Sequence, residues 1–468
     1  MTRTTQGSET TGPQINPHVF REYDIRGVAD RDLGDDFTQS LGQAIGTLLR
    51  GRGAGRVAVG RDVRPSSPRL REALVAGLRR TGLDVVDIGE VPTPLLYFAV
   101  WHLDLDGGVQ ITGSHNPSED NGFKMMTGKA SLFGEDIQTL RRSMESGDLA
   151  SGGLGTVEEV DLLPAYVGYL RGNMELGGGT LRFAVDAGNG VAGPAALAAM
   201  RALGLDPIPL LCEPDGRFPV HHPDPSQPEN LELLRQTIAD EGIDLGIAFD
   251  GDGDRIGVLD AKGEVLFGDK LLALFARDLL ERRPGATVIG EVKCSQTLYD
   301  DIAARGGRPI MWKTGHSLIK TKMKEEGALL AGEVSGHMFF ADRYYGFDDA
   351  IYAALRLIEL LSRSDQPLHA LLKDLPVTHT TPEIRVACPD ATKFAVVDQV
   401  REHFAQTREV VAIDGARIRF DEGWGLVRAS NTQPVLVLRF EASSPMQLAT
   451  IRAEVERAVE RAKVAVDV

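Results

Sequence analysis

Residues 107–124 read GGVQITGSHNPSEDNGFK and join a short strand to an abrupt polar turn. Val109 and Ile111 alternate with polar neighbours, which predicts a strand, and the following TGSHNP consists almost entirely of turn formers. Ser114 stands at the tip of this turn, so its hydroxyl would project from a strand end among backbone N–H groups, a setting that suits a phosphate. Taken alone, the stretch favours an ordinary Ser/Asn turn, and only the rest of the chain argues against that interpretation.

The order strand, helix, strand, helix, strand occurs three times along the chain, which indicates an internal repeat. The first strands of the three copies are RVAVGR (56–61), LRFAVD (181–186) and TVIGE (287–291). The third strands, GGVQI, LGIAF and LLAGE, run into the polar turns TGSHNP (112–117), DGDGDR (250–255) and EVSGH (333–337). Ligands bind at the carboxyl ends of strands in open α/β sheets. The three turns therefore predict a common site.

The C-terminal part of the chain has a different pattern. After a predicted linker, LPVTHTTP (375–382), the chain reads strand, helix, several short strands and helix, which is typical of a small antiparallel α+β domain. The turn RASNTQP (428–434) lies between two of these strands. We predict an α/β protein with three related α/β units and a C-terminal antiparallel α+β domain. The predicted boundaries are 17–159, 160–263, 264–376 and 377–468.

Length, charge and cysteine content restrict the class of protein. The 468 residues suggest about three domains, and a net charge of −16 opposes binding to nucleic acid or to an anionic membrane. We find no apolar run that could span a bilayer and no signal segment at the start. The three cysteines are odd in number and widely spaced, which indicates a reducing compartment. We predict a cytoplasmic protein in which residues 1–16 form a disordered tail.

Asp250, Asp252 and Asp254 alternate with glycines in DGDGDR, directly after a predicted buried strand. Glycine lets the backbone curl tightly enough for three carboxylates to converge on one cation, and all-oxygen ligation suits Mg²⁺. A calcium EF-hand loop is the main rival, but it requires a glutamate at the twelfth position, where this chain has Ala261. In a solvated acidic turn only Arg255 would offset the three carboxylates. We therefore predict a metal site.

The segment GNGVAG (188–193) matches G-x-G-x-x-G between a predicted strand and a predicted helix, a weak signal for a dinucleotide site. Asp186 occupies the turn before the first glycine, and the corresponding loops of the other two repeats lack these glycines. We interpret the segment as a tight structural turn.

The neighbours Ser114 and His115 invite a hydrolase interpretation with the histidine as base. Adjacent residues on an extended backbone point to opposite faces, so we expect no direct hydrogen bond between these two side chains. The chain has no G-x-S-x-G elbow here. His115 is expected to touch phosphate or to shape the loop.

The turn at Arg428, Ser430, Asn431 and Thr432 presents a row of hydrogen-bond donors. A guanidinium can grip phosphate in a bidentate manner, and hydroxyl and N–H groups can bind the remaining oxygens. A hydrophilic hairpin is a reasonable alternative on these residues alone.

Glu333, Ser335 and His337 alternate and would share one face of an extended segment, where a carboxylate beside a hydroxyl suits sugar hydroxyl groups. Single polar residues at other loop positions are Arg26, Lys124, Lys293 and His316. A lone lysine or histidine is usually just solvated. These four residues are therefore relevant only if they lie beside the polar turns at the carboxyl ends of the strands.

TGSHNP, DGDGDR, GEVSGH and RASNTQP, in this order, resemble the four signature loops of the α-D-phosphohexomutase superfamily. The resemblance covers nearly the whole chain, from YDIRG at Tyr23 to the last domain. The segments FREYDIRG, VGRD, NGFK, EVKCS, KTGHSLIK and GFDDAIY are similar to the bacterial phosphomannomutase/phosphoglucomutase group. Gln433 departs from the more usual threonine, while the donors before it are intact.

The resemblance implies a monomer of four domains, three of them with mixed sheets, around a central cleft to which each domain contributes one loop. The loops would be, in chain order, a phosphoserine loop, a metal-binding loop, a sugar-binding loop and a phosphate-binding loop. The reaction implied is a reversible phosphoryl transfer between the 1- and 6-positions of hexose phosphates, mannose and/or glucose. It would use a phosphoserine enzyme, Mg²⁺ and a hexose 1,6-bisphosphate as intermediate and activator.

Roles follow for individual residues. Ser114 would carry the phosphoryl group and, with Asp250, Asp252 and Asp254, would hold the metal. The other residues implied in catalysis are Arg26, Lys124 and His316, the last two as candidate general acid or base. The residues implied in substrate binding are Tyr23, Arg255, Lys293, Glu333, Ser335, His337, Arg428, Ser430, Asn431 and Thr432.

Three alternatives stay open. A phosphoglucosamine mutase would have the same fold, but its loops more often have alanine before the serine and glutamine after the glutamate, where this chain has Gly113 and Val334. A metal-dependent sugar phosphatase could use the same aspartates. A non-catalytic sugar-phosphate sensor would not need the transferable hydroxyl of Ser114.

Overall fold

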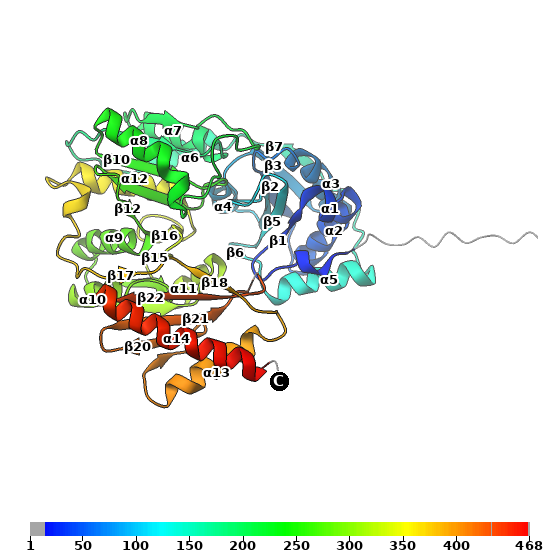
Figure 1. Cartoon of the computed structure of the whole chain (residues 1–468). Coiled ribbons are helices and arrows are strands. Elements are labelled where there is room, and N and C mark those ends of the chain that lie inside the picture. The colour runs from blue at the N-terminus through cyan, green and yellow to red at the C-terminus, as the bar shows by residue number, and fades with distance from the viewer. Residues whose placement is uncertain (1–14, 432, 467–468) are drawn as a thin grey trace, which may run out of the picture.

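The computed structural model describes residues 15–431 and 433–466 and folds them into four lobes (Figure 1). In this view the N-terminal lobe (blue to cyan) lies on the right, the second lobe (green) at the top, the third at the left and the C-terminal lobe (orange to red) below. The predicted tail 1–16 lies outside the described residues except for its last two positions. None of the helices in the described ranges is both long and apolar enough to cross a membrane.

The first lobe contains one seven-stranded mixed sheet. Its elements are η1 (Pro17–Val19), β1 (Ile25–Val28), α1 (Ala29–Asp32), α2 (Asp35–Gly51), β2 (Arg56–Arg61), α3 (Ser67–Arg80), β3 (Asp84–Glu90), α4 (Thr93–His102), β4 (Gly107–Ile111), β5 (Asp120–Thr127), β6 (Ala130–Ser131), α5 (Glu135–Ser146) and β7 (Val157–Glu159). The strand order is β1-β5-β4-β2-β3-β7, with β6 beside β5.

The second and third lobes contain a five-stranded and a four-stranded sheet. The second comprises α6 (Leu163–Asn173), β8 (Phe183–Asp186), α7 (Ala192–Ala202), β9 (Ile208–Leu210), η2 (Pro228–Leu231), α8 (Glu232–Glu241), β10 (Leu245–Phe249), β11 (Ile256–Asp260) and β12 (Val265–Leu266). The third comprises α9 (Gly268–Arg282), β13 (Thr287–Glu291), α10 (Gln296–Ala304), β14 (Arg308–Trp312), α11 (His316–Glu326), β15 (Leu330–Gly332), β16 (Met338–Phe340), α12 (Ala350–Ser362) and η3 (Leu368–Ala370). Their strand orders are β12-β11-β10-β8-β9 and β14-β13-β15-β16.

The three sheets repeat one topology, which confirms the predicted repeat. In each lobe the first strand of the repeat pairs in parallel with both the second and the third, as β2 does with β3 and β4. The same holds for β8 with β9 and β10, and for β13 with β14 and β15. A fourth strand then returns antiparallel to the third, as β5, β11 and β16 do. The three polar turns lie at the carboxyl ends of β4, β10 and β15.

Equivalent glycines end the first helix of each repeat. Gly82, Gly204 and Gly306 follow α3, α7 and α10 and adopt φ values of +81°, +77° and +77°. A left-handed residue after a helix turns the chain and satisfies the last carbonyl groups, and glycine adopts that conformation without steric cost. Glycine directly after an apolar helical pattern is itself a signal for a helix end, so the sequence alone also favours these three ends.

The C-terminal lobe contains one antiparallel sheet covered by two helices. Its elements are β17 (His379–Thr380), β18 (Ile384–Ala387), α13 (Lys393–Ala405), β19 (Val410–Val411), β20 (Ala416–Phe420), β21 (Gly423–Ala429), β22 (Val435–Ala442) and α14 (Pro445–Val466). Part of the predicted linker is therefore a strand, because residues 379 and 380 pair with the end of β22.

The hydrophobic core shows which lobes form one body. A continuous apolar cluster includes Phe98 of the first lobe, Phe183 of the second and Phe275 of the third. The C-terminal lobe has its own core between its sheet and helices, with Phe440 and Val455 among its members. Its apolar contact with the third lobe is a small separate cluster that includes Trp424. The C-terminal lobe is thus joined less extensively than the other three.

Candidate active site

Ser114 lies in the turn between β4 and β5 and is 2% exposed. Its backbone has a φ of +49°, in the left-handed region that residues with a Cβ rarely adopt. The Thr112 hydroxyl accepts a hydrogen bond of 2.8 Å from the Ser114 amide. Strained backbone of this kind often occurs at functional sites, and here it aims the Ser114 hydroxyl toward the second lobe.

Arg64 holds this turn in place from beneath. Its buried guanidinium donates to the main-chain carbonyls of Ser114 (2.8 Å), Asn116 (2.6 Å), Asp120 (2.9 Å) and Pro117. Its Nε bonds Asp62 at 3.1 Å, which keeps the buried charge paired. Arg64 was not predicted as a site residue. It stands in DVRPSSP (62–68) at the carboxyl end of β2, at the same edge of the sheet as the Ser114 turn.

The expectation that Ser114 and His115 do not bond each other is wrong. Ser114 Oγ lies 3.0 Å from His115 Nδ1. The expectation assumed an extended backbone, whereas the positive φ of Ser114 brings the two adjacent side chains together. Burial, then the nearby charges of Arg255 and Arg26, hold the pKa of His115 well below its usual value. Its ring is therefore neutral beside the hydroxyl.

Asp250, Asp252 and Asp254 converge as predicted, all of them fully buried in the turn between β10 and β11. Ser114 Oγ donates to Asp250 Oδ2 at 2.9 Å, which joins the first two loops. Lys124 of β5 places its Nζ 2.7 Å from Asp252 Oδ2 and 2.5 Å from Asp254 Oδ2. Sequence analysis did not identify Thr93, whose hydroxyl donates to Asp252 at 2.5 Å.

The chemistry of this cluster fits a divalent metal ion. One carboxylate oxygen from each aspartate lies within 4.8 Å of the others. Asp252 Oδ1 is buried without a hydrogen-bond partner among the described residues. Burial and the neighbouring Asp254 and Asp252 raise the pKa of Asp250 well above its usual value, so the ionised trio requires more positive charge nearby. Hard oxygen ligands of this kind suit Mg²⁺.

Lys124 and His316, the two candidates for proton transfer, differ in charge state. Burial alone would lower the pKa of Lys124, but Asp252, Asp254 and Asp250 raise it above its usual value. Burial, then the charges of Lys320, His337 and Lys124, hold the pKa of His316 well below its usual value. Lys124 is therefore a fixed cation, while the His316 ring is neutral and can accept a proton.

The third loop meets the second through His337. Its Nδ1 lies 2.6 Å from Glu333 Oε2, and its Nε2 lies 3.2 Å from Asp254 Oδ1 and 3.3 Å from Arg255 Nε. Burial alone would lower the pKa of His337, but Asp254 and Glu333 raise it to about 9. Ser335 Oγ lies 3.3 Å from the same ring. Glu333 also accepts from the Gly315 amide at 2.7 Å, which links this loop to the start of α11.

The fourth loop reaches the first lobe from the opposite side. Asn431 Nδ2 donates to the Tyr23 hydroxyl at 2.9 Å, and that hydroxyl donates to the Thr314 carbonyl at 3.1 Å. Arg428 is 7% exposed and bonds Asp414 at 3.0 Å. Ser430, 7% exposed, lies between them in the same turn. Thr432, the remaining predicted donor, lies outside the described residues.

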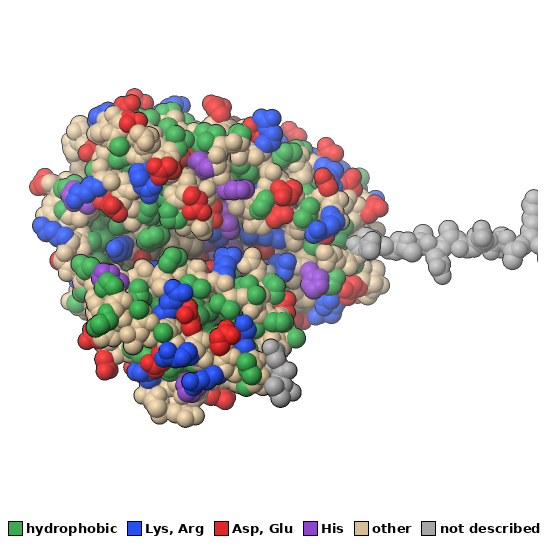
Figure 2. All heavy atoms as spheres, in the orientation of Figure 1, with side chains coloured by type: hydrophobic (Ala, Val, Ile, Leu, Met, Phe, Trp, Pro, Cys, Tyr) green, Lys and Arg blue, Asp and Glu red, His purple; other side chains and the backbone are tan. Residues whose placement is uncertain are grey.

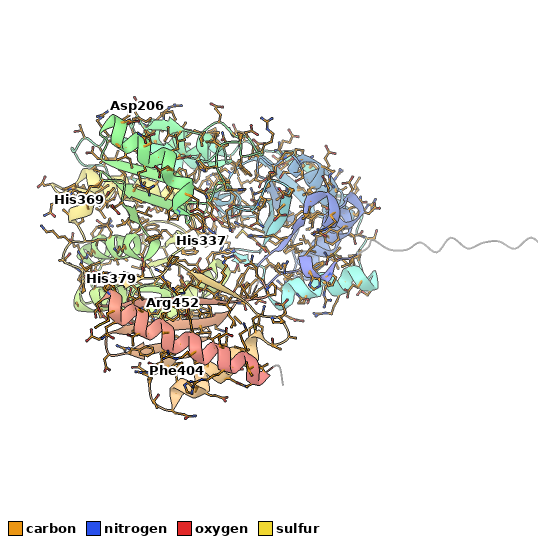
Figure 3. The ribbon with its side chains drawn as sticks, in the orientation of Figure 1. Asp206, His337, His369, His379, Phe404 and Arg452 are labelled. Atoms are coloured by element: carbon orange, nitrogen blue, oxygen red, sulfur yellow. The ribbon has the colours of Figure 1, made fainter. Side chains whose placement is uncertain are left out.

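Arg26 and Lys293 also lie at the boundaries between loops. Arg26 donates to Asn116 Oδ1 at 3.1 Å, beside the Ser114 turn. Lys293 Nζ lies 3.2 Å from Glu383 Oε2, between the third and C-terminal lobes. In the space-filling view a hollow with Lys, Arg and His side chains separates the C-terminal lobe from the upper lobes (Figure 2). His337 lies near the centre of the molecule, between the lobes (Figure 3).

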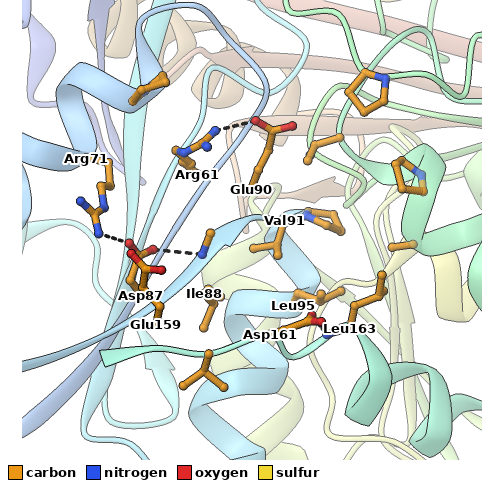
Figure 4. Close-up of a pocket in the computed structure, with 18 of the residues that line it drawn as sticks. Arg61, Arg71, Asp87, Ile88, Glu90, Val91, Leu95, Glu159, Asp161 and Leu163 are labelled. Atoms are coloured by element: carbon orange, nitrogen blue, oxygen red, sulfur yellow. Dashed lines mark hydrogen bonds and ion pairs between the residues drawn. The ribbon is translucent and has the colours of Figure 1, made fainter. Parts of the chain in front are cut away.

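A second cavity, of about 590 Å³, lies behind the metal loop between the first two lobes (Figure 4). Its rim carries the ion pairs Arg61–Glu90, at 2.5 Å, and Arg71–Asp87. None of the predicted site residues lines it. The four loops therefore converge on the central hollow and not on this cavity.

Comparisons with known proteins agree with this arrangement. Four models of phosphoglucomutase/phosphomannomutase match in succession: alpha/beta/alpha domains I, II and III at residues 17–151, 164–263 and 267–379, and the C-terminal domain at 383–458. A phosphomannomutase/phosphoglucomutase of Pseudomonas aeruginosa is 48% identical over 447 residues, which cover 95% of this chain and 96% of that relative. The chain belongs to the phosphoglucomutase/phosphomannomutase family.

Other members of the phosphoglucomutase/phosphomannomutase family are similar over the same length. A phosphoglucomutase of Neisseria gonorrhoeae is 44% identical over 450 residues, 95% of this chain and 97% of the relative. A solved phosphoglucomutase/phosphomannomutase family protein of Burkholderia thailandensis has a TM-score of 0.91 at 44% identity, covering 96% of this chain and 98% of that one. The predicted superfamily, α/β fold class and mutase class of enzyme are thus confirmed.

The GNGVAG segment packs against the metal loop of this family member. The Val191 amide donates to the Gly251 carbonyl at 3.1 Å. A Cβ on Gly193 would lie 2.3 Å from the Cys212 carbonyl oxygen, and one on Gly190 would lie 2.8 Å from the Gly251 carbonyl oxygen. Close backbone packing accounts for these glycines, in agreement with their interpretation as a structural turn.

Proposed function

We propose that this chain reversibly converts hexose 1-phosphates and hexose 6-phosphates through a phosphorylated Ser114 and a bisphosphorylated sugar. The observation that carries the proposal is the contact of Ser114 Oγ with Asp250 at 2.9 Å, in a buried site that also contains Lys124. A second group of donors, around Arg428 and Asn431, faces the hollow from another lobe. A reaction through a bisphosphorylated sugar needs two phosphate-binding sites, one for the phosphate that is transferred and one that holds the other phosphate.

In the first step, a free hydroxyl of the bound hexose monophosphate attacks the phosphorus on Ser114, and the bond to Ser114 Oγ breaks. The bisphosphorylated sugar then turns within the hollow and returns its other phosphate to Ser114. Catalysis of such a transfer depends on positioning and on neutralising charge. Lys124 and Arg255 supply fixed positive charge, and Arg64 fixes the backbone of the serine turn.

The proton has to be accounted for at both ends of the transfer. The sugar hydroxyl loses a proton as it attacks, and we propose that the neutral ring of His316 accepts it. Ser114 Oγ gains a proton as its phosphoryl group leaves and loses that proton again when the bisphosphate returns a phosphoryl group. The free Ser114 hydroxyl lies 2.9 Å from Asp250 Oδ2 and 3.0 Å from His115 Nδ1, and we propose that these two groups exchange this proton with it.

Asp250, Asp252 and Asp254, with the phosphate on Ser114, would hold Mg²⁺. When bound, the ion would stabilise negative charge on the transferring phosphoryl group. The chain's own contribution is a buried set of carboxylates that Thr93 and Lys124 keep in place.

The C-terminal lobe supports the turning step. It has its own core and meets the first lobe through Asn431 and Tyr23. We propose that it moves as a unit, loosening its grip so that the bisphosphate can turn and closing again to exclude water. Exclusion of water limits hydrolysis of the phosphoserine.

We propose that both mannose and glucose phosphates are substrates, because relatives in the family carry the names phosphomannomutase and phosphoglucomutase. A hexose 1,6-bisphosphate would restore enzyme that has lost its phosphate. We also propose a monomer in the cytoplasm, where the three cysteines, none of which forms a disulfide, would stay reduced.

One experiment separates the candidate activities. We would measure kcat/KM in parallel for mannose 1-phosphate, glucose 1-phosphate and glucosamine 1-phosphate, and inorganic phosphate release in the same reactions. The proposal predicts efficient isomerisation of the first two and little release of phosphate. Preference for the amino sugar would indicate a phosphoglucosamine mutase, and phosphate release without isomer would indicate a phosphatase.

A further inference from the structure

A second set of metal-ligating groups lies next to the aspartate trio. Asp254, His337 and Asp348 are all buried and offer one ligand atom each within 4.8 Å of one another. The two carboxylate oxygens of Asp254 contact different groups. Its Oδ2 contacts Lys124 beside the aspartate trio, while its Oδ1 lies 3.2 Å from His337 Nε2. His316 joins the group, with its Nδ1 3.6 Å from Asp348 Oδ2.

Two atoms of this group lack the hydrogen bonds that buried polar groups normally have. Within the described part of the chain, Asp348 Oδ2 and His316 Nδ1 have no hydrogen-bond partner, while Asp254 Oδ1 is paired with the His337 ring. The Asp348 side chain is fully buried, so water cannot compensate from outside. The charge of Asp348 is offset by Lys320, whose Nζ contacts the other carboxylate oxygen at 2.9 Å. One oxygen of Asp348 is thus used, and the other points toward an imidazole.

We propose that Asp254, His337 and Asp348, with His316 beside Asp348 as a fourth ligand, form a second cation site, selective for Zn²⁺-like metals, in which Asp254 bridges to the aspartate trio. Two imidazoles and two carboxylates form a set that suits Zn²⁺ better than Mg²⁺. In a tetrahedral site with bonds of 2.0–2.1 Å, neighbouring ligand atoms stand about 3.3 Å apart. Two neighbouring pairs already have about this spacing, His337 with Asp254 at 3.2 Å and His316 with Asp348 at 3.6 Å, and the ligand atoms of Asp254, His337 and Asp348 lie within 4.8 Å of one another.

Occupation of this site would inhibit the enzyme. The metal would displace the proton of the His337 ring, as metal binding to histidine requires, and would bind that ring and one oxygen of Asp254. It would also take away His316 as a proton acceptor. The site would therefore make activity sensitive to micromolar transition metals even when Mg²⁺ is saturating. The metal site itself rests only on the side-chain geometry; the inhibition rests on the proposed function.

The test measures metal content and affinity directly. Purified full-length protein is saturated with Mg²⁺ and titrated with Zn²⁺ by calorimetry, and bound metals are counted by mass spectrometry after rapid desalting. We expect one Zn²⁺ bound in addition to Mg²⁺. Loss of a ligand in His316→Gln or Asp348→Asn should weaken Zn²⁺ binding at least about tenfold while Mg²⁺ binding changes little. Co²⁺ in place of Zn²⁺ should give the visible spectrum of a four-coordinate imidazole site, and that spectrum should be lost in His316→Gln.

A third variant changes affinity in the opposite direction. Lys320→Met removes the cation that competes for Asp348 and should tighten Zn²⁺ binding, which general damage to the fold would not do. If Zn²⁺ only displaces Mg²⁺ one for one, or if its affinity is the same in all three variants, the second site is refuted. That result would leave the proposed mutase activity untouched, and absence of mutase activity would leave the metal count valid.

Discussion

The substitution Arg64→Lys tests whether the serine turn is held from beneath. Arginine satisfies four main-chain carbonyls at once because its donors form a fork, whereas lysine has a single nitrogen. Of these four bonds only the one to the Ser114 carbonyl is fully buried, whereas the carbonyl of the exposed Pro117 also accepts from the Asp120 amide at 3.0 Å. If lysine loses the bond to Ser114, one buried carbonyl is left unsatisfied, at a cost of about 1–3 kcal/mol. The turn should therefore lose about 1–3 kcal/mol of stability although the charge is kept.

Amide hydrogen exchange measures this loss where it occurs. The Thr112 amide donates to the Gly122 carbonyl at 3.0 Å across the base of the turn. A loss of 2 kcal/mol should accelerate its exchange about 30-fold, and kcat should fall at least about tenfold because Ser114 is no longer fixed. The matched control is Arg217→Lys, an exposed arginine that forms an ion pair with Asp215, and this change should alter stability by less than about 0.5 kcal/mol. Wild-type exchange and kcat in Arg64→Lys would refute the reasoning.

Three further predictions concern the metal, the fourth loop and a buried carboxyl group. Asp252→Asn should weaken Mg²⁺ binding at least about tenfold, which calorimetry can measure. Chelation of the wild-type protein should abolish activity until Mg²⁺ is restored, and full activity in excess chelator would contradict the metal site. Asn431→Ala should raise KM more than it lowers kcat. Because the Asn431 and Tyr23 side chains share a hydrogen bond of 2.9 Å, a double-mutant cycle with Tyr23→Phe should show coupling between the two substitutions. Strictly additive effects would count against a role for this hydrogen bond. Burial raises the pKa of Asp349 to about 6, so the folded state binds a proton that the unfolded state releases near pH 4. Its stabilising contribution is complete below pH 4 and falls, by about 3 kcal/mol, as the pH rises to 6. Thermal unfolding of Asp349→Asn should lack this decline relative to wild type, and parallel pH profiles of the two proteins would contradict the raised pKa.

Most of the fold follows from local sequence. The apolar strands of the repeats and the glycines at Gly82, Gly204 and Gly306 predict where the strands and helices lie, because burial and left-handed backbone are local demands. The repeat then places three polar turns at equivalent sheet edges. The short strand β17 could not be predicted, since its two residues form a strand only by pairing with β22, far along the chain.

Site residues could be predicted from the sequence where they belong to a recognisable polar turn. They could not be predicted where a single side chain contacts a residue far away in the sequence. Ser114 and the three aspartates stand in such turns. Arg64 and Thr93 act through contacts with carbonyls and a carboxylate that lie far from them in the sequence. The Ser114–His115 contact was mispredicted because the alternation rule assumes an extended backbone, and the positive φ at Ser114 breaks that assumption.

The central claim is that Ser114 carries the phosphoryl group that the reaction exchanges. The most direct measurement is the mass of the intact protein, with peptide mapping, before and after incubation with glucose 6-phosphate or mannose 6-phosphate. We predict that protein charged with glucose 1,6-bisphosphate carries one phosphoryl group, on the peptide containing Ser114, and transfers it to the added sugar phosphate. Ser114→Ala should carry none and should not turn over. A wild-type rate in Ser114→Ala, or turnover with the phosphoryl group on another residue, would contradict the account.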